Sequence, residues 1–252
     1  MSRGDSLRNI ARNATRPDYL PVMARKVAAR LRPSHRDAAL RWCADVAEDL
    51  PRFANSLDPA LWSEAEEFGR EFRARARARL AALGVELGGG GHFQLVYFLV
   101  RHLQPTVVLE TGVAAGWTSS AILTALERNG GGTLYSSDFP YFRLEEPERY
   151  VGCLVEDRLR GDWHLGVKGD RANLAEFLPE IDRIDFVHYD SDKTAEGRTY
   201  ALERIAPKLA PGAPVMMDDI DDNTFFRDYA ATVPAHTRVF ARGRKYVGLV
   251  GL

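Results

Sequence analysis

The sequence contains little cysteine and no long apolar run. Only two of its 252 residues are cysteines, Cys43 and Cys153, which is too few for a disulfide framework and lacks the spacing of a metal site. No stretch of about 18 consecutive apolar residues occurs, and the N-terminus is polar and basic, without the apolar segment of a secretion signal. These absences predict a cytoplasmic protein that does not enter a membrane.

An excess of positive charge is also missing. The chain has 34 Lys and Arg residues against 35 Asp and Glu, so its overall charge gives no reason to expect a nucleic-acid partner. Arginines between Arg70 and Arg79 concentrate basic charge locally, but most of them fall outside the apolar stripe of their predicted helix. We interpret them as a solvated face, with a surface for phosphate or acidic groups as the alternative.

Residues 1–85 are predicted to form a helical extension, and residues 86–252 a separate α/β domain. In the extension, residues 1–16 are expected to be a loose leader, followed by helices over 18–31, ended by Pro33, and from Ser34 to about residue 50. A third helix is the clearest, because Asp58 can cap it, Pro59 suits its first turn and Gly84 suits its end. We expect these helices to cover the functional site or to join copies of the chain into a homo-oligomer.

From residue 106 onward, predicted strands alternate with helices. The strands are expected at 106–111, 133–138, 164–169, 184–190, 214–219, 236–241 and 245–250. This alternation predicts a doubly wound, seven-stranded and mainly parallel sheet. Only the turn 242–244 separates the last two strands, so they are expected to form an antiparallel hairpin.

The first strand runs into a glycine turn that predicts a ligand site. An apolar run ends in Glu110, Gly112 and Gly116 follow, and a helix begins near Thr118. Such a junction brings backbone N–H groups close to a ligand, beyond the carboxyl ends of the strands. The spacing E-x-G-x-x-x-G differs from the G-x-G-x-x-G of dinucleotide folds, and the acid suits a cationic or amine-bearing ligand better than a phosphate.

This segment resembles motif I of the class I S-adenosylmethionine (SAM) methyltransferases, whose seven-stranded sheet is also closed by a hairpin. The resemblance implies that Asp138, at the second strand end, accepts hydrogen bonds from the ribose hydroxyls of SAM, since a carboxylate offers two acceptor oxygens. It also implies that Gly169 and Asp170 lie near the adenine. The residues assigned to the cofactor are Glu110, Thr111, Gly112, Gly116, Thr118, Ser119, Asp138, Phe139, Gly169, Asp170 and Asp190.

Acidic residues follow the fourth and fifth predicted strands. Asp190 belongs to a D-x-D-K sequence, and Asp218 and Asp219 form a pair. Neighbouring strands bring these three carboxylates together, where they would repel one another unless a cation neutralised them. Hard oxygen ligands suit Mg²⁺ or Mn²⁺, so we predict a metal site formed by these three residues. The alternative is that the pair only caps the following helix.

The sequence from 86 to 252 resembles more specifically the macrocin and sugar O-methyltransferases. In that group a D-x-D strand end and a later D-D pair share a divalent metal, and the second acid, here Asp192, is the general base. The D-x-x-K spacing also resembles catechol O-methyltransferase, in which the lysine, here Lys193, is the base. That enzyme has Asp-Asn at the position of the D-D pair, and close relatives often carry histidine at position 193. We prefer Asp192, because a lysine beside carboxylates tends to stay charged.

The predicted function is metal- and SAM-dependent O-methylation of a small molecule with adjacent hydroxyls, such as a sugar or catechol moiety of a natural product. Metal-independent N- or C-methylation is one alternative, and a SAM-binding regulatory protein without turnover is another. Three aromatic residues after the second strand, Tyr141, Phe142 and Tyr150, are candidates for the wall of the acceptor pocket. His92 either reaches the ligands or is a solvated loop residue.

Overall fold

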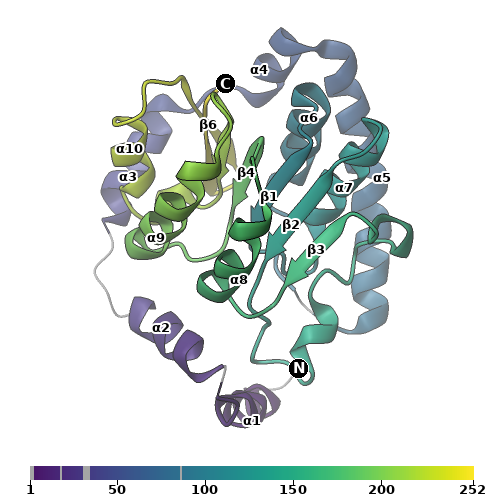
Figure 1. Cartoon of the computed structure of the whole chain (residues 1–252), viewed down its shortest axis with the longest axis vertical. Helices are drawn as coiled ribbons and strands as arrows, with labels where there is room; N and C mark the ends of the chain where they lie inside the picture. Colours follow the sequence, from purple (N-terminus) through teal and green to yellow (C-terminus); the bar gives the residue numbers. More distant parts are fainter. Residues whose placement is uncertain (1–2, 18, 31–34, 86) are drawn as a thin grey trace.

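A seven-stranded sheet with the order β3-β2-β1-β4-β5-β7-β6 forms the middle layer of the protein (Figure 1). The computed structural model describes residues 3–17, 19–30, 35–85 and 87–252. The strands are β1 (Val107–Thr111), β2 (Thr133–Ser137), β3 (Trp163–Gly166), β4 (Phe186–Tyr189), β5 (Val215–Met217), β6 (Thr237–Arg242) and β7 (Lys245–Val250). Strands β1 to β5 pair in parallel, while β7 runs antiparallel to both β5 and β6. The predicted doubly wound sheet with its terminal hairpin is confirmed.

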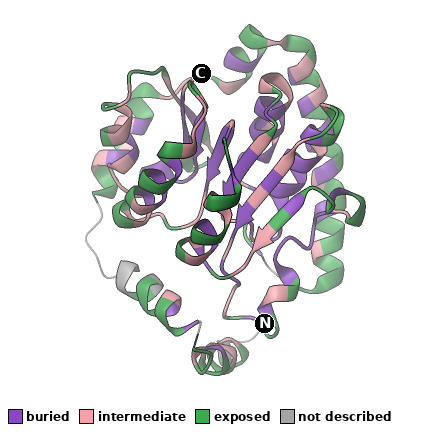
Figure 2. Ribbon diagram, in the orientation of Figure 1, coloured by how far each residue is buried: buried purple, intermediate pink, exposed green. Residues whose placement is uncertain are grey.

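Helices cover both faces of the sheet, which explains why its central strands are apolar on both sides. One face carries α4 (Leu50–Leu57), α5 (Pro59–Leu83), α6 (Phe93–Leu103) and α7 (Trp117–Arg128). The other carries α3 (Arg36–Val46), α8 (Asp170–Phe177), α9 (Ala195–Ile205) and α10 (Phe225–Ala230). Figure 2 shows the buried strands between helices whose outer sides are exposed. None of the described helices combines the length and the apolarity that a membrane span requires.

The long helix α5 begins and ends where its sequence predicts. Asp58 accepts a hydrogen bond from the backbone N–H of Leu61 at 2.9 Å, and Gly84 closes the helix in the left-handed conformation, with φ of 65°. The predicted apolar stripe faces the core, with Phe68 and Phe72 both buried. The caps and the stripe together fix α5 against α6.

Two parts of the first 57 residues differ from the sequence prediction, while the helix predicted over 18–31 is present as α2. The expected loose leader contains a helix, α1 (Arg3–Ala14), followed by α2 (Leu20–Arg30). The helix expected from Ser34 to about residue 50 is two helices, α3 and α4, because Asp49 starts a new helix by accepting a hydrogen bond from the N–H of Arg52. Residue 18, the predicted start of the α2 segment, and residues 31–34, which include Pro33 and Ser34, lie outside the described residues, as does residue 86 at the domain boundary.

The break between α3 and α4 covers an edge of the sheet. The backbone N–H of Glu48 donates to the carbonyl of Val239 in β6 at 2.8 Å, and Glu48 forms an isolated parallel bridge with Phe240. The carboxylate of Glu48 also pairs with Arg238 at 3.0 Å. The turn between α3 and α4 therefore lies along β6, the outermost strand.

Glu64 connects α5 to the neighbouring helices α6 and α7. Its carboxylate accepts hydrogen bonds from Arg101 of α6 at 2.9 Å and from Arg128 of α7 at 3.1 Å, and also from the hydroxyl of Tyr97. The hydrogen bond from Arg101, supported by those from Tyr97 and Arg128, lowers the pKa of Glu64 to about 2, although burial opposes the shift. The charged form of Glu64 thus stabilises the fold.

We expect Glu64→Gln to lower the free energy of unfolding at pH 7 by about 1–2 kcal/mol, a modest value because the carboxylate is partly exposed. Since the pKa is lowered in the folded state, this stabilisation is complete above the usual glutamate pKa of about 4.5 and disappears as the pH falls toward about 2. Urea unfolding of both proteins at pH 7 and pH 3 measures the difference, which should shrink at pH 3. Glu71→Gln, an exposed residue of the same helix, is the matched control; an equal loss in both variants would contradict the prediction.

Candidate active site

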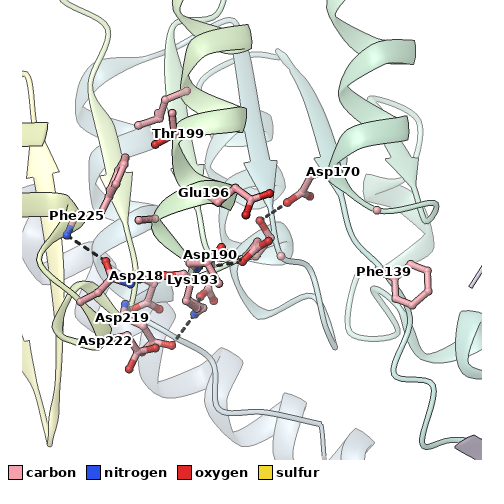
Figure 3. A pocket seen from close by; sticks show the side chains of 18 of the residues that line it. Phe139, Asp170, Asp190, Lys193, Glu196, Thr199, Asp218, Asp219, Asp222 and Phe225 are labelled. Atoms are coloured by element: carbon pink, nitrogen blue, oxygen red, sulfur yellow. Dashed lines mark hydrogen bonds and ion pairs between the residues drawn. The ribbon is translucent and has the colours of Figure 1, made fainter. Parts of the chain in front are cut away.

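A large cavity opens at the carboxyl ends of the parallel strands, where doubly wound sheets bind ligands. Its volume is about 1610 Å³, well above the roughly 300–1,000 Å³ of a typical small-molecule pocket. Residues from the ends of β1, β2, β3, β4 and β5 line it: Gly112, Ala114, Asp138, Phe139, Gly169, Asp170, Asp190, Asp192, Lys193, Asp218 and Asp219. Figure 3 shows the acidic end of this cavity, with Phe139 apart from the acids. The cavity is large enough for a cofactor and a second molecule.

Gly112 sits where the turn after β1 meets the end of β4. Its φ is 88°, which a side chain rarely tolerates, and a Cβ atom there would lie 2.4 Å from the backbone carbonyl oxygen of Asp190. Only glycine lets the two strand ends approach this closely. The predicted glycine turn is therefore present, and it forms part of the cavity wall.

Glu110 has a different position from the one predicted for a cofactor ligand. Its side chain is fully buried and accepts hydrogen bonds from Ser119 at 2.6 Å, from Ser136 at 2.7 Å and from Thr118. Those hydroxyls hold α7 and β2 against the end of β1. Glu110, Thr118 and Ser119 therefore organise the turn from inside the core instead of facing the cavity.

Two further residues assigned to the cofactor also support the turn from behind. Thr111 is buried, and its hydroxyl oxygen lies 2.9 Å from that of Ser191. Gly116 has φ of 90°, and a Cβ atom there would lie 2.9 Å from the Cα of Gly152. Both residues shape the site without lining the cavity.

Asp138 lies at the end of β2 and lines the cavity, as predicted. One carboxylate oxygen accepts a hydrogen bond from the N–H of Ala114 at 2.8 Å, and the other from Phe139 at 2.7 Å. These bonds fix the carboxylate beside the glycine turn.

Gly169 and Asp170 follow β3 and also line the cavity. Asp170 accepts hydrogen bonds from Ser137 at 2.7 Å and from Ser191 at 2.5 Å. It thereby connects the ends of β2 and β4, and the predicted G-D element lies on the same side of the cavity as Asp138.

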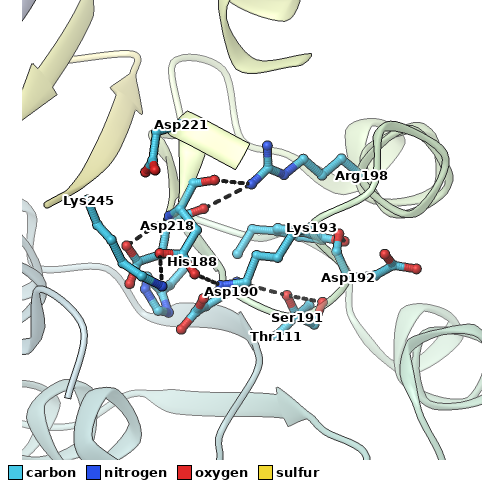
Figure 4. Close-up of polar contacts among 12 residues, drawn as sticks. Thr111, His188, Asp190, Ser191, Asp192, Lys193, Arg198, Asp218, Asp221 and Lys245 are labelled. Atoms are coloured by element: carbon cyan, nitrogen blue, oxygen red, sulfur yellow. Dashed lines mark hydrogen bonds and ion pairs between the residues drawn. The ribbon is translucent and has the colours of Figure 1, made fainter. Parts of the chain in front are cut away.

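The predicted acids after β4 and β5 come together around a lysine (Figures 3 and 4). The ammonium of Lys193 contacts Asp190 and lies 2.5 Å from Oδ2 of Asp219. Lys245, the first residue of β7, pairs with the other oxygen of Asp219 at 2.6 Å. Asp218 uses Oδ1 to accept the N–H of Asp219 at 2.9 Å. We call Asp190, Lys193, Asp218, Asp219 and Lys245 the acid–lysine cluster.

The predicted metal site does not have the geometry of one. Among the residues that the structure describes, no group of three His, Cys, Asp or Glu side chains is arranged to hold a metal ion. The carboxylates of Asp190 and Asp219 point at the ammonium of Lys193, which stands between them. The cation beside these acids in the structure is the ammonium group of Lys193, where the sequence predicted Mg²⁺ or Mn²⁺.

Electrostatics favour the charged form of Lys193. Burial alone would lower its pKa, but Asp190 and Asp219 together raise it above the ordinary lysine value. Burial also opposes ionisation of Asp219, yet Lys193 and then Lys245 hold its pKa below the usual range. At Asp190, burial outweighs the effect of Lys193, so the pKa of Asp190 is raised. A lysine that stays protonated cannot accept a proton, which argues against Lys193 as the base.

Asp192, the preferred base, is exposed at the mouth of the cavity. Its Oδ1 accepts hydrogen bonds from the backbone N–H and the hydroxyl of Thr194, at 3.0 and 2.8 Å. Thr194 in turn caps α9. Asp192 therefore has a structural task at the start of α9, and its Oδ2 lies close to Gly197 in the first turn of that helix.

The other candidates divide between the cavity and the core. Tyr141 and Phe142 line the cavity, as predicted, whereas Tyr150 is buried in the core. His92 is also buried, and burial lowers its pKa to about 4. It is a neutral packed side chain, neither solvated nor in the cavity wall.

Comparison with known proteins agrees with this arrangement. Residues 109–220, from β1 to the end of the D-D pair, match the family model described as "Methyltransferase domain". The match confirms the enzyme class that the sequence predicts, a SAM-dependent methyltransferase. No curated protein matches the chain significantly.

Solved structures share the fold of the methyltransferase domain. An O-methyltransferase from Bacillus cereus, solved in complex with SAH, has a TM-score of 0.55 at 15% identity, over 79% of this chain and 94% of that one. A methyltransferase from Geobacter sulfurreducens has a TM-score of 0.53 at 19% identity, over 72% and 88%. At such low identity, these similarities establish the class I methyltransferase fold.

Two residues that position the methyltransferase site were missed in the sequence. Arg198 of α9 is fully buried and donates hydrogen bonds to the backbone carbonyls of Asp218 and Asp219, at 3.0 and 2.9 Å (Figure 4). Lys245 reaches the cluster because β7 lies next to β5. The predicted hairpin could have indicated Lys245, whereas an arginine inside an amphipathic helix gives no such signal.

Proposed function

We propose that the chain transfers a methyl group from SAM to a hydroxyl oxygen of a small molecule. The observation that carries this proposal is the continuity of the cavity, which joins Asp138 and the glycine turn at one end to the acid–lysine cluster at the other. The first end suits a nucleoside with a vicinal diol, and the second supplies proton acceptors and a fixed positive charge beside an acceptor oxygen. A binding protein without turnover would not need the second end.

The cofactor is proposed to lie along the ends of β1, β2 and β3. The carboxylate of Asp138 would receive the two ribose hydroxyls, because it is the fixed acceptor nearest the glycine turn. Phe139 and Gly169 would lie against the adenine, and Gly112 would leave room for the methionine part of SAM. The sulfonium then points toward Asp190, where the strand ends meet.

The two N-terminal helices are proposed to close this end of the cavity as a lid. The ring of Tyr19 packs on that of Phe139, with centroids 4.7 Å apart, and Val22 and Arg25 line the cavity. A lid that excludes water favours methyl transfer over side reactions. Formation of a homo-oligomer through the helical extension remains a second proposal for these helices.

The reaction is an in-line displacement at carbon. The acceptor oxygen attacks the methyl carbon, the carbon–sulfur bond breaks with its electron pair remaining on sulfur, and SAH leaves as the neutral thioether. The hydroxyl proton passes to a carboxylate that lines the cavity, and we propose Asp192 for this role. The enzyme contributes alignment of the two reactants and stabilisation of the oxyanion.

The predicted Mg²⁺ or Mn²⁺ does not fit the residues that would hold it. Asp190 and Asp219 are already paired with an ammonium group, and Asp218 is engaged with the backbone of Asp219. The proposed reaction therefore contains no metal-dependent step. The proposed acceptor remains a sugar or catechol-like unit of a natural product, a size that the large cavity accommodates beside SAM.

The test is turnover with labelled cofactor. The purified protein is incubated with SAM carrying ¹³C in its methyl group and a panel of catechols, sugars and matched amines, and the products are examined by NMR. We expect SAH to accumulate and the label to appear as an O-methyl signal. Label on nitrogen or carbon would favour the N- or C-methylation alternative, and SAH binding without turnover of any acceptor would favour the regulatory one.

A further inference from the structure

We propose that Lys193 takes the place of a divalent metal in this protein: its ammonium group neutralises Asp190 and Asp219 and supplies the positive charge beside the acceptor hydroxyl. The role beside the hydroxyl rests on the proposed O-methyl transfer. The replacement of a metal by Lys193 does not rest on that function, because it concerns only the residues of the acid–lysine cluster.

The first argument is the position of the ammonium group. Its nitrogen contacts carboxylates from the ends of two neighbouring strands, Asp190 after β4 and Asp219 after β5. This is the point at which a cation shared by the two strand ends would have to lie. Lys193 also lines the cavity, so the charge faces the space in which the acceptor binds.

The second argument is that the lysine is held in place. Asn223 donates a hydrogen bond to the backbone carbonyl of Lys193 at 2.7 Å, and the hydroxyl of Tyr189 donates to that of Asp192 at 2.8 Å. The side chain of Lys193 is only 26% exposed. The backbone that carries Lys193 is thus held by both neighbouring segments, and its side chain is held by the ion pairs with Asp190 and Asp219.

The third argument is the charge balance of the cluster. Lys245 adds a second ammonium to Asp219 from the other side, at 2.6 Å. A divalent ion beside Asp219 would therefore face two positive charges at short range, and their repulsion is large where water is scarce. Binding of such an ion would require Lys193 to leave.

Manganese binding tests the replacement without any acceptor. Electron paramagnetic resonance and calorimetry with Mn²⁺ alone are applied to the wild-type protein and to Lys193→Ala and Lys193→Met, with folding verified by thermal melts. We expect no stoichiometric Mn²⁺ binding to the wild type, and binding tighter by about tenfold or more in the variants, because the freed carboxylates are oxygen ligands for such ions. Lys168→Ala, which breaks an exposed ion pair with Glu176, is the matched control and should behave as the wild type.

The outcomes separate this proposal from the proposed function. Stoichiometric Mn²⁺ binding by the wild type that disappears in Asp219→Asn would overturn the replacement, as would folded Lys193 variants that gain no binding. Once an acceptor is known, turnover should be unaffected by an excess of chelator. Failure to find an acceptor would count against the proposed O-methylation. The Mn²⁺ titrations would still decide whether Lys193 takes the place of a metal.

Discussion

Gly112→Ala is expected to destabilise the protein by about 2–5 kcal/mol and to abolish measurable cofactor binding. The φ of 88° costs about 1–2 kcal/mol for a residue with a side chain. The added Cβ atom would lie 2.4 Å from the backbone carbonyl oxygen of Asp190. Moving one strand end to relieve this contact costs about 1–3 kcal/mol more. Urea unfolding measures the first effect, and calorimetric titration with SAH the second.

Two other glycines separate these causes. Gly84 also has a positive φ, but a Cβ atom there meets nothing within 4 Å, and Gly161 has neither constraint. Gly84→Ala should therefore lose about 1 kcal/mol, and Gly161→Ala almost nothing, both with unchanged SAH affinity. If Gly112→Ala were no worse than Gly84→Ala, the close approach of the β1 and β4 ends would not matter for stability.

Asp138→Ala is expected to weaken SAH binding by about a hundredfold. The variant would lose the two proposed charge-assisted hydrogen bonds between the Asp138 carboxylate and the ribose, each worth about 1.5–3 kcal/mol. It would also release the N–H groups of Ala114 and Phe139 that it now fixes. Calorimetric titration of the folded variant with SAH measures the change in the dissociation constant.

The control for this variant is an acid on the same domain that faces solvent. Asp157 has a fully exposed side chain, so Asp157→Ala should bind SAH as the wild type does. An unchanged dissociation constant in a folded Asp138→Ala variant would remove this carboxylate from the cofactor site and require the ribose to lie elsewhere.

Much of the fold could be predicted because its signals are local. The structure has a strand at each predicted place, because strand-forming segments alternate with helical ones along the chain. The caps of α5, Asp58 and Gly84, act within one turn of the helix and are readable for the same reason. By contrast, α1 is short and polar, and such a helix depends on contacts that a sequence pattern does not contain.

The site was predictable to the level of strand ends, but not to the direction of each side chain. The acids after β4 and β5 meet because neighbouring parallel strands end at the same edge. Whether Glu110 faces the cavity or the core depends on the hydroxyls around it, which come from α7 and β2. Likewise, only the folded loop shows that the ammonium of Lys193 reaches Asp219, 26 residues away.

The turn that runs along β6 limits how two copies of the chain can associate. An outermost strand normally offers free N–H and C=O groups, to which a strand of another molecule can add. Here the N–H of Glu48 donates a hydrogen bond to the Val239 carbonyl, and the Glu48–Arg238 ion pair lies at the same edge. A dimer built as one continuous sheet through β6 is therefore disfavoured, and aggregation by strand addition is hindered at this edge.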